Sequence, residues 1–426
     1  MRSTESLLFL SVRYNLLLAS ALNAKRHSRS TIGDKIRNSN GEAKEVAKQE
    51  AKSLKEEISS LEQQLSEIDD KLYSLALTIP NDTHPDVPIG PEEAANIVAT
   101  HGPKPIDSNL KRDHVSVGKA LDLFDLEQAA TVTGSSWYYL LNEGALLEMA
   151  LTQYALSKAV ARGFKPVTTP DVVKADVAMR CGFQPRDQGD PPVHQMYHLQ
   201  NTNPAQPELV LSGTAEIPLG GLFANSVYQE EELPLKVVGL GRAFRSEAGA
   251  RGADTRGLFR VHQFSKLELF AVCAQESSED VMKEMVDLQV DIFSGLGLPL
   301  RILDMPTEEL GASAYRKFDI EAWMPGRGNW GEISSTSNCT DYQARRLHIR
   351  YKRSSSSPAD PPQGTAPIPF SHTLNGTAAA IPRLIVAILE NGARFDEDGK
   401  VVGLDLPSAL KPFWIGSTDG IRMEWY

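Results

Sequence analysis

The segment GRAFRSEAGARGADTRGLFRVHQFSKLE, residues 241–268, contains the pattern on which the fold prediction rests. Two runs rich in β-branched and aromatic residues, Leu235 to Phe244 and Leu258 to Phe270, are typical of strands. Between them lies a glycine-rich stretch, Ala248 to Gly257. Because glycine lets a backbone turn sharply and approach another molecule closely, we expect a β-hairpin whose loop can contact phosphates or a nucleic-acid strand.

The surrounding sequence predicts an α+β domain built on an antiparallel sheet. Strand-like runs cluster instead of alternating regularly with helices, and the clearest helical pattern covers Leu141 to Arg162. The chain has 426 residues, which is enough for two or three domains and favours an enzyme over a small binding module.

A heptad repeat near the N-terminus predicts a long coiled-coil helix. Apolar residues recur in alternating steps of four and three at Ala47, Ala51, Leu54, Ile58, Leu61, Leu65, Ile68, Leu72 and Leu75. A second apolar stretch, Leu7 to Ile36, can supply the partner helix, and the residues Asn38 to Gly41 between the two are typical of a turn. We expect an antiparallel helical hairpin with its tip near residues 37–42.

Charge is distributed unevenly along this hairpin. Residues 25–55 carry nine Lys/Arg against four Asp/Glu, whereas residues 56–75 carry one against six. The basic end is the tip, where a phosphate backbone could bind, although a solvated coiled coil without an RNA partner is the alternative interpretation. The whole chain has a net charge of -11, so any contact with nucleic acid must be local.

Proline marks the expected domain boundary. The stretch from Pro80 to Pro103 contains too much proline to continue a helix. We therefore predict a helical arm at residues 1–80, with a possible transit segment at its start, a linker at 81–110 and a catalytic domain at 111–426. A Ser- and Pro-rich segment, Lys352 to Pro369, is expected to form a surface loop.

The first thirty residues suggest a targeting segment. They contain five basic residues against the single acid Glu5, with several serines, as organellar transit peptides do, although an ordinary basic helix start is the alternative. The three cysteines form no CxxC pair, so we expect neither disulfides nor zinc. No apolar run is long enough to span a membrane.

Two further segments stand out beside the hairpin. Residues 331–346 read GEISSTSNCTDYQARR, and residues 371–392 begin SHTLNGT, continue through Pro382-Arg383-Leu384 and end in Glu-Asn-Gly. No GxxxxGK[ST] motif occurs, and the sequence VVGLG at 237–241 lacks the third glycine of a dinucleotide fingerprint. ATP chemistry, if present, must therefore use another type of site.

Together these three segments resemble motifs 2 and 3 and the intervening active-site segment of class II aminoacyl-tRNA synthetases, in the form typical of seryl-tRNA synthetases. The resemblance covers about Ala43 to Leu406. It implies a class II catalytic domain, an antiparallel sheet flanked by helices, with an N-terminal antiparallel coiled-coil arm. It also implies an enzyme that activates L-serine with ATP and Mg²⁺ to seryl-adenylate and pyrophosphate, and then transfers serine to the 3′ end of tRNA(Ser).

The resemblance assigns nucleotide-binding roles. Arg245 would hold the α-phosphate and the serine carboxylate, and Arg383 and Phe264 would sandwich the adenine. Glu332 and Ser335 would hold Mg²⁺, which prefers oxygen ligands. The implied catalytic residues are Arg245, Glu247 and Arg383. The implied nucleotide-binding set is Arg245, Ser246, Glu247, Val261, Phe264, Glu332, Ile333, Ser334, Ser335 and Arg383.

It also assigns a serine site. Glu216, in the segment Thr214-Ala215-Glu216, would lie near the ammonium group, and Glu268 would bind the hydroxyl with help from Thr377. Such a site rejects alanine because its polar groups would be left unpaired. The implied serine-binding set is Thr214, Ala215, Glu216, Arg245, Glu268, Asn375 and Thr377.

Two further expectations follow from the resemblance. Gly163 to Pro170 resembles motif 1, which forms the dimer interface in this class, so a homodimer is expected. The segment Ala378 to Arg383 looks more like mitochondrial forms of the family, and with the basic N-terminus it favours the mitochondrial matrix, with the cytoplasm as the alternative. The competing functions are an adenylating relative that loads a carrier protein and a non-catalytic RNA-binding scaffold.

Overall fold

The computed structural model describes residues 2–183, 195–200, 203, 205–247, 256–354, 368–417 and 423–426. Most of the predicted hairpin loop, residues 248–255, lies outside the described residues, as do residues 355–367 of the predicted surface loop. The same holds for Met1 and for the side chains of residues 2–8, at the start of the expected transit segment. The chain divides into two compact units, Met1–Pro80 and Asn81–Tyr426.

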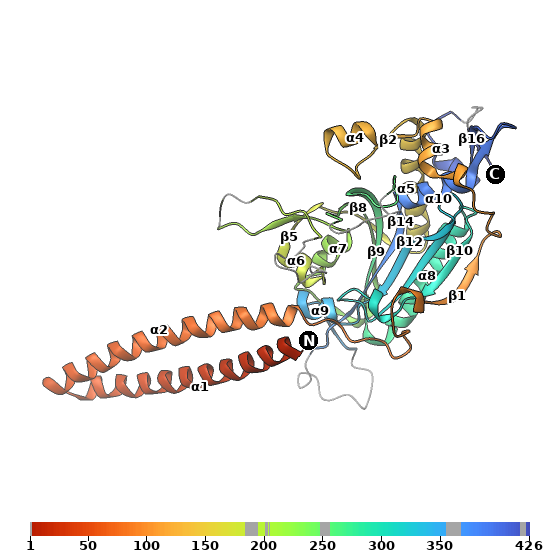
Figure 1. The fold of residues 1–426 in the computed structure, drawn as a ribbon. Helices are drawn as coiled ribbons and strands as arrows, with labels where there is room; N and C mark the ends of the chain where they lie inside the picture. The colour runs from red at the N-terminus through yellow and green to blue at the C-terminus, as the bar shows by residue number, and fades with distance from the viewer. Residues whose placement is uncertain are drawn as a thin grey trace. The chain divides into compact units, whose positions relative to one another are not determined.

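The first unit is an antiparallel pair of helices (Figure 1), α1 (Arg2–Asn38) and α2 (Glu42–Leu77). Every predicted seam residue is buried or half-buried, and the seam's buried centre consists of Leu22, Leu54 and Ile58. Ion pairs cross between the helices, from Lys25 to Glu57 at 2.6 Å and from Arg26 to Glu62 at 2.8 Å. The predicted helical hairpin and its tip at residues 37–42 are confirmed.

The second unit is built on an eight-stranded sheet with the order β1-β10-β11-β12-β14-β9-β8-β4. All neighbouring pairs are antiparallel except β4 and β8, which run parallel. The predicted α+β class with an antiparallel sheet is therefore confirmed. The strands are β1 (Asn96–His101), β4 (Lys165–Thr168), β8 (Leu235–Phe244), β9 (Gln263–Cys273), β10 (Leu300–Asp304), β11 (Arg316–Met324), β12 (Asn329–Asn338) and β14 (His372–Ala380).

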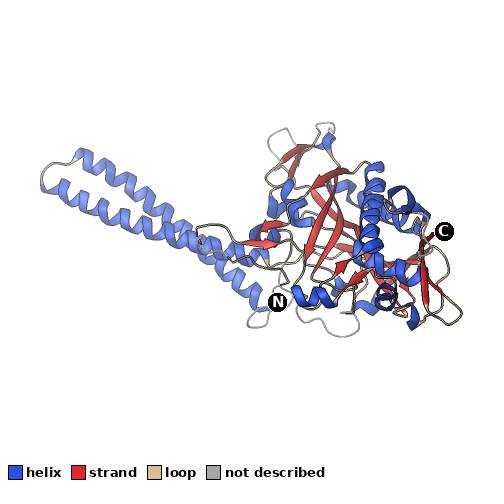
Figure 2. Cartoon of the chain, turned by 90° about the horizontal axis from the view of Figure 1, so that it is seen from above, coloured by secondary structure: helices blue, strands red, loops and turns tan. Residues whose placement is uncertain are grey.

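Three long helices accompany this sheet (Figures 1 and 2): α5 (Asn142–Ala161), α8 (Ser278–Ser294) and α10 (Ile381–Gly392). Their apolar faces share one hydrophobic core with strands β9 to β12 and β14. Helix α5 agrees with the predicted helix at Leu141 to Arg162. Helix α10 begins directly after β14, and a proline in its first turn suits a helix start because no backbone donor is needed there.

Smaller elements surround the sheet. The short helices are α3 (His114–Ala120), α4 (Glu127–Val132), α6 (Ala175–Arg180), α7 (Glu216–Leu222) and α9 (Tyr342–Leu347). The short strands are β2 (Phe124–Asp125), β3 (Tyr139–Leu140), β5 (Val172–Lys174), β6 (Leu209–Leu211), β7 (Val227–Gln229), β13 (Arg350–Lys352), β15 (Ala393–Phe395), β16 (Val401–Leu406) and β17 (Met423–Trp425). All three cysteines are buried free thiols.

The stretch expected to be a linker, residues 81–110, belongs to the second compact unit. Its prolines flank the β-branched run Asn96–His101, which pairs with β10 as the edge strand of the sheet. The amides of Asn81 and His84 donate to the carbonyls of Ala312 and Tyr315, at 2.8 and 2.9 Å. Proline content alone therefore did not distinguish a free linker from chain attached to a sheet.

The predicted β-hairpin is present, since β8 pairs with β9 from Leu235 opposite Val272 to Phe244 opposite Gln263. Its second strand begins at Gln263, five residues after the predicted start at Leu258. The backbone N–H of Leu258 donates to the His114 ring instead of to the sheet, at 3.2 Å. Among the described helices, none combines the length and apolar character that a membrane span requires.

Candidate active site

A polar pocket lies where the β8–β9 hairpin, strand β12 and the start of α10 meet. Of the predicted nucleotide-binding set it contains all but Ser246. Its lining residues are Arg245, Glu247, Phe259, Val261, Phe264, Lys266, Glu332, Ile333, Ser334, Ser335, Thr377, Ala380, Pro382 and Arg383. Residues from three distant segments of the sequence, one for each of the three motifs, therefore line one cavity.

Arg245, directly after β8, is held from two sides. Its backbone N–H donates to the carbonyl of His262 at 2.8 Å, and its Nε donates to the carbonyl of Gly213 at 3.3 Å. Its guanidinium lies 5.2 Å from the centre of the Phe264 ring, in cation–π contact. These contacts fix the side chain at the pocket wall before any ligand is bound.

A second arginine comes from α10. Arg383 donates to the Glu332 carboxylate at 3.0 Å and to the Glu332 carbonyl at 2.8 Å, and its Nε donates to the carbonyl of Phe259 at 3.2 Å. Burial on its own would raise the pKa of Glu332, but the charges of Arg383 and Lys317 hold it below its ordinary value. The carboxylate of Glu332 is therefore ionised at neutral pH, and it remains 40% exposed.

A β-bulge brings Glu332 and Ser335 to the same pocket. Residues three apart on a regular strand point to opposite faces of the sheet. In β12, however, Ser334 pairs with Ile320 and Glu332 pairs with Glu321, so Ile333 is an extra residue. The bulge restores a common face, and it explains how an alternating strand can present both predicted metal ligands.

Aromatic residues near the two arginines differ in part from the prediction. Phe264 and Arg383 both line the pocket, yet the arginine over the Phe264 ring is Arg245. Arg383 instead lies over Phe259, at 4.7 Å from the ring centre, and Arg327 lies at 3.7 Å from the same ring. The sequence analysis placed Phe259 only in the predicted strand run Leu258 to Phe270 and gave it no separate role.

The predicted serine-binding residues form a buried cluster beside this pocket. The carboxylate of Glu216 accepts hydrogen bonds from Gln343 at 2.6 Å and from Asn375 at 2.9 Å. Thr377 lies opposite Glu268 in the β14–β9 ladder, and Thr377 also lines the pocket. Thr214 and Ala215 precede α7 and are nearly inaccessible to solvent.

Lys266, which was not predicted from the sequence, connects the cluster to the pocket. Its Nζ lies 2.7 Å from Glu268 Oε2 and donates to Thr214 Oγ1 at 3.2 Å. Lys266 and Glu268 are 8% and 1% exposed, so this ion pair is buried. The signal was available, since Phe264, Lys266 and Glu268 alternate along β9 and therefore share one face of the sheet.

Three predicted residues are used mainly within the protein. The Ser334 hydroxyl donates to the carbonyl of Thr377 at 2.6 Å, which ties β12 to β14. Glu247 forms an ion pair with Arg260 at 3.1 Å, and it adopts a left-handed backbone with φ of 45°. The backbone N–H of Ser246 donates to the carbonyl of Gln195 at 2.9 Å.

Chemically, the pocket combines two fixed guanidinium groups with an ionised carboxylate. Guanidinium groups bind phosphate and carboxylate oxygens in a fork geometry, and a carboxylate suits a hard divalent cation. The adjoining cluster of buried acids can bind an ammonium group. This set of groups fits a reaction between a phosphoanhydride and a small amino acid.

Comparisons with known proteins agree with this chemistry. A family model described as "tRNA synthetase class II core domain (G, H, P, S and T)" matches residues 197–392, and one described as "Seryl-tRNA synthetase N-terminal domain" matches residues 13–83. The antiparallel sheet and its pocket are thus those of a class II aminoacyl-tRNA synthetase.

Comparison with individual relatives identifies the family within this class of synthetases. The chain is 45% identical to serine–tRNA ligase of Rhodopirellula baltica, over 81% of this chain and 76% of the relative. It is 43% identical to the mitochondrial serine–tRNA ligase of Saccharomyces cerevisiae, over 81% and 73%. The seryl-tRNA synthetase of Pyrococcus horikoshii, solved in complex with ATP, aligns with a TM-score of 0.79 at 32% identity, covering 96% of this chain and 91% of that one. This chain belongs to the seryl-tRNA synthetase family, and its activity is that of a serine–tRNA ligase.

The role that the sequence predicts for the buried acid Glu216, binding of the serine ammonium group, would make serine binding dependent on pH. Burial first, and then the nearby charge of Glu268, raise its pKa to about 7. Only the ionised form attracts an ammonium group, so we expect the KM for serine to rise about tenfold as the pH falls from about 8 to about 6. Serine-dependent ATP/pyrophosphate exchange across this range measures the effect, and the KM for ATP should stay constant.

Two variants complete this test. Glu216→Gln should weaken serine binding at every pH and remove the pH dependence, whereas the exposed control Glu93→Gln should behave as wild type. A serine KM that stays flat between these pH values in the wild-type protein would contradict this assignment.

Proposed function

We propose that the pocket between Arg245 and Arg383 carries out the activation step, in which serine and ATP form seryl-adenylate and pyrophosphate. The observation that supports this most directly is the convergence of Arg245, Glu332 and Arg383, from three separate motifs, on one cavity. The proposed catalytic residues are Arg245, Glu247 and Arg383.

In the proposed step the serine carboxylate attacks the α-phosphorus of ATP and pyrophosphate leaves from the opposite side. The attacking group is already an anion and needs no general base, so catalysis depends on orientation and on neutralisation of charge. Arg245 binds both the α-phosphate and the serine carboxylate. Arg383 and Phe264 hold the adenine, with Val261 at the same wall. Glu247 lines the same pocket, where it can contact the nucleotide, and its ion pair with Arg260 orients its carboxylate.

Glu332 and Ser335 fit a magnesium ion. Both offer oxygen donors, both line the pocket because of the β12 bulge, and Glu332 is ionised and partly exposed. Bound there, Mg²⁺ would neutralise phosphate charge during the reaction. Arg383 lies beside them, and its ion pair with Glu332 at 3.0 Å restricts the orientation of that carboxylate.

Replacing Glu332 tests this role. Glu332→Gln keeps the shape of the side chain and removes its charge, and we expect exchange activity to fall on the order of 100-fold, as for other groups that stabilise developing charge. The remaining activity should need more Mg²⁺. The control Glu284→Gln removes an acid that pairs with Lys236 at 2.7 Å outside the pocket, and it should retain activity. Normal activity and normal Mg²⁺ dependence in Glu332→Gln would rule out the metal role.

Serine selection is proposed for the buried cluster. Burial raises the pKa values of both Glu216 and Glu268, and the nearby positive charges of Lys266 and Arg245 act in the opposite direction on each. Serine, a zwitterion, would place its carboxylate on Arg245 and its ammonium near the ionised form of Glu216. Glu268, held by Lys266, and Thr377 then bind the hydroxyl, which alanine lacks. Thr214, Ala215 and Asn375 complete the site.

The helical arm is proposed to bind tRNA(Ser) through its basic end. Several of the basic side chains there are exposed, among them Lys35, Lys48, Lys52 and Lys55. Phosphate contacts made by lysine depend strongly on salt concentration and carry little sequence information. The arm would therefore contribute affinity, while the pocket supplies the chemistry.

Charge reversal separates the two contributions. Lys52→Glu combined with Lys55→Glu should leave serine-dependent exchange unchanged and lower the charging of tRNA at least tenfold at moderate salt. The control Glu56→Lys, on the same exposed surface of α2, should not lower charging. If exchange and charging fell together, the arm would be acting on the pocket and not on tRNA.

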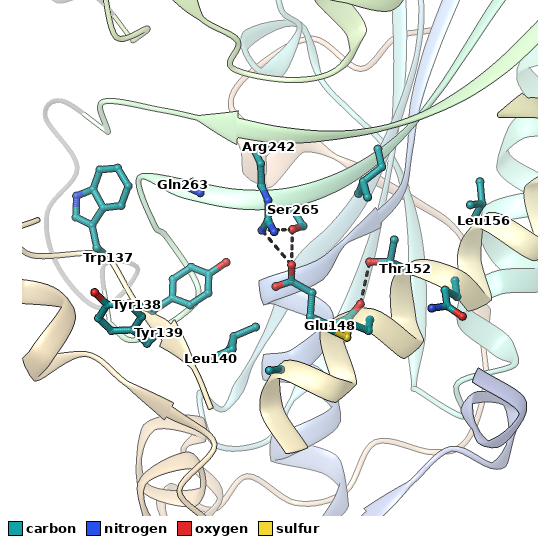
Figure 3. A pocket seen from close by; sticks show the side chains of 14 residues that line it. Trp137, Tyr138, Tyr139, Leu140, Glu148, Thr152, Leu156, Arg242, Gln263 and Ser265 are labelled. Atoms are coloured by element: carbon teal, nitrogen blue, oxygen red, sulfur yellow. Dashed lines mark hydrogen bonds and ion pairs between the residues drawn. The ribbon is translucent and has the colours of Figure 1, made fainter. Parts of the chain in front are cut away.

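A second copy of this chain is proposed to cover the groove between α5 and the β8–β9 hairpin. This cavity of about 640 Å³ is lined by Tyr139, Met149 and Leu240, which are 44%, 49% and 42% exposed. Figure 3 shows the Glu148 carboxylate facing both Arg242 and Ser265, which donate hydrogen bonds to it at 3.0 and 2.5 Å. The groove is next to the edge of the sheet that β4 forms. Strand β4 belongs to the segment that resembles motif 1. Exposed apolar residues beside a strand edge favour pairing with another copy.

Sedimentation velocity tests the homodimer. The wild-type protein should sediment as a species whose mass is about twice that of one chain, which is 46.7 kDa. Met149→Glu with Leu240→Glu should give monomers, because each charge would be buried without a partner. Val132→Glu, an exposed position on α4, is the control and should remain dimeric. A monomeric wild-type protein would contradict this proposal.

The mitochondrial matrix is the proposed compartment. The support is the basic, acid-poor start of the chain and the similarity to a mitochondrial relative. A fluorescent protein fused after the full chain should enter mitochondria in yeast cells, and changing Arg2, Arg13 and Arg29 to glutamate should prevent this. Cytoplasmic fluorescence of the unmodified fusion would support the alternative compartment.

A further inference from the structure

Residues 256–259, at the C-terminal end of the predicted hairpin loop, support the nucleotide side of the pocket. The carbonyl of Phe259 accepts the Nε hydrogen bond of Arg383 at 3.2 Å. The Phe259 ring contacts Arg327 and Arg383, with the two guanidinium carbons 3.7 and 4.7 Å from its centre. The position of Arg383 therefore depends on whatever fixes this short segment.

A buried histidine fixes it. His114, at the start of α3, is 1% exposed, and its Nε2 accepts the backbone N–H of Leu258 at 3.2 Å. Since Nε2 accepts a hydrogen bond, the ring proton must reside on Nδ1, which lies 3.0 Å from Glu390 Oε1. His114 thus connects the Leu258 amide to a carboxylate on α10.

Glu390 is fully buried and its carboxylate accepts four hydrogen bonds. Oε1 accepts from the backbone N–H and the ring of His114, at 3.3 and 3.0 Å. Oε2 accepts from the backbone N–H groups of Gly326 and Arg327, at 2.7 and 3.0 Å. Because all its acceptor positions are used, the buried charge is compensated and the side chain has one orientation.

The neighbouring residues reinforce this arrangement. Asp113 accepts two hydrogen bonds from Arg256, at 3.2 and 2.8 Å, at the other end of the same segment. Gly257 has a φ of +62°, and a Cβ there would lie 2.2 Å from His114 Nε2. Ligand atoms of Asp113, His114 and Glu390 lie within 4.8 Å of one another, which could suit a metal, but their polar atoms already hold protein partners. The arrangement is therefore a polar anchor.

We propose that His114 and Glu390 are positioning residues for ATP: they hold Leu258 and Phe259 in place and thereby orient Arg383 toward the nucleotide. This inference rests on the proposed function of the pocket. Arg383 and Glu390 both belong to α10, seven residues or two turns apart, so they lie on the same side of the helix. Helix α10 thus supplies both Arg383 and the Glu390 carboxylate, which through His114 fixes the segment that contacts Arg383.

The proposal predicts an effect on ATP but not on serine, because the anchor contacts the Phe259 side of the pocket and not the cluster around Glu216. In His114→Gln and in Glu390→Gln, the KM and the Kd for ATP should rise about tenfold, while the KM for serine changes less than twofold. The double variant should be no worse than the poorer single variant, since both residues act through one contact. His84→Gln is the matched control, because the His84 ring also accepts a backbone N–H, from Asp86 at 3.1 Å, away from the pocket.

Exchange kinetics give the two KM values, and calorimetry with ATP alone gives the Kd. Parallel changes in both KM values, or a lower melting temperature with normal ATP binding, would overturn the proposal and leave only a structural role. If the wild-type protein showed no serine-dependent exchange, the proposed function would fail, and the ATP Kd values would still decide on the anchor.

Hydrogen–deuterium exchange of the wild-type protein provides a second test that does not depend on the variants being folded. Amides in residues 256–262 should exchange slowly without ATP, because the Leu258 N–H is bonded and buried. Rapid exchange there would contradict a preformed anchor.

Discussion

The hydrogen bonds of Arg383 are the interaction on which the rest of the active site depends. A guanidinium group on a helix can point in many directions, and here it is fixed by an ion pair to Glu332 on β12 and by the carbonyl of Phe259. These contacts join α10, β12 and the segment before β9 into one unit. The charge of Arg383, together with that of Lys317, also lowers the pKa of Glu332, so a guanidinium group and an ionised carboxylate lie side by side in one cavity.

A second constraint is the burial of charge beside this pocket. Glu216 and Glu268 are almost inaccessible to solvent, and burial of uncompensated carboxylates is costly. The positive charges of Lys266 and Arg245 offset that cost. The hydrogen-bonding and charged groups that remain available in the cluster would match a zwitterion with a hydroxyl group. Rejection of alanine would then follow from unpaired buried groups, which is a stronger effect than loss of one contact area.

The regular spacing of residue types explains what the sequence could predict. The heptad seam specified the helical hairpin because steps of three and four residues place every apolar side chain on one stripe, and Leu54 and Ile58 are buried there. The hairpin of β8 and β9 followed from two β-rich runs around glycine. The three motifs correctly brought Arg245, Glu332 and Arg383 together.

What the sequence did not reveal depends on tertiary contacts. The bulge at Ile333, which places Glu332 and Ser335 on a common face, changes no sequence pattern. Phe259 and His114 are isolated residues whose importance comes from partners more than a hundred positions away, such as Arg383 and Glu390. Lys266 is different, since its alternation with Phe264 and Glu268 could be seen in the sequence and places all three side chains on one face of β9.

A crystal structure with a non-hydrolysable seryl-adenylate analogue tests the central claim most directly. We expect the analogue's phosphate to contact Arg245, its adenine to lie between Phe264 and Arg383, and its seryl group to be directed toward Glu268 and Thr377. An analogue bound elsewhere, for example in the groove beside α5, or one whose phosphate faces away from Arg245, would contradict it.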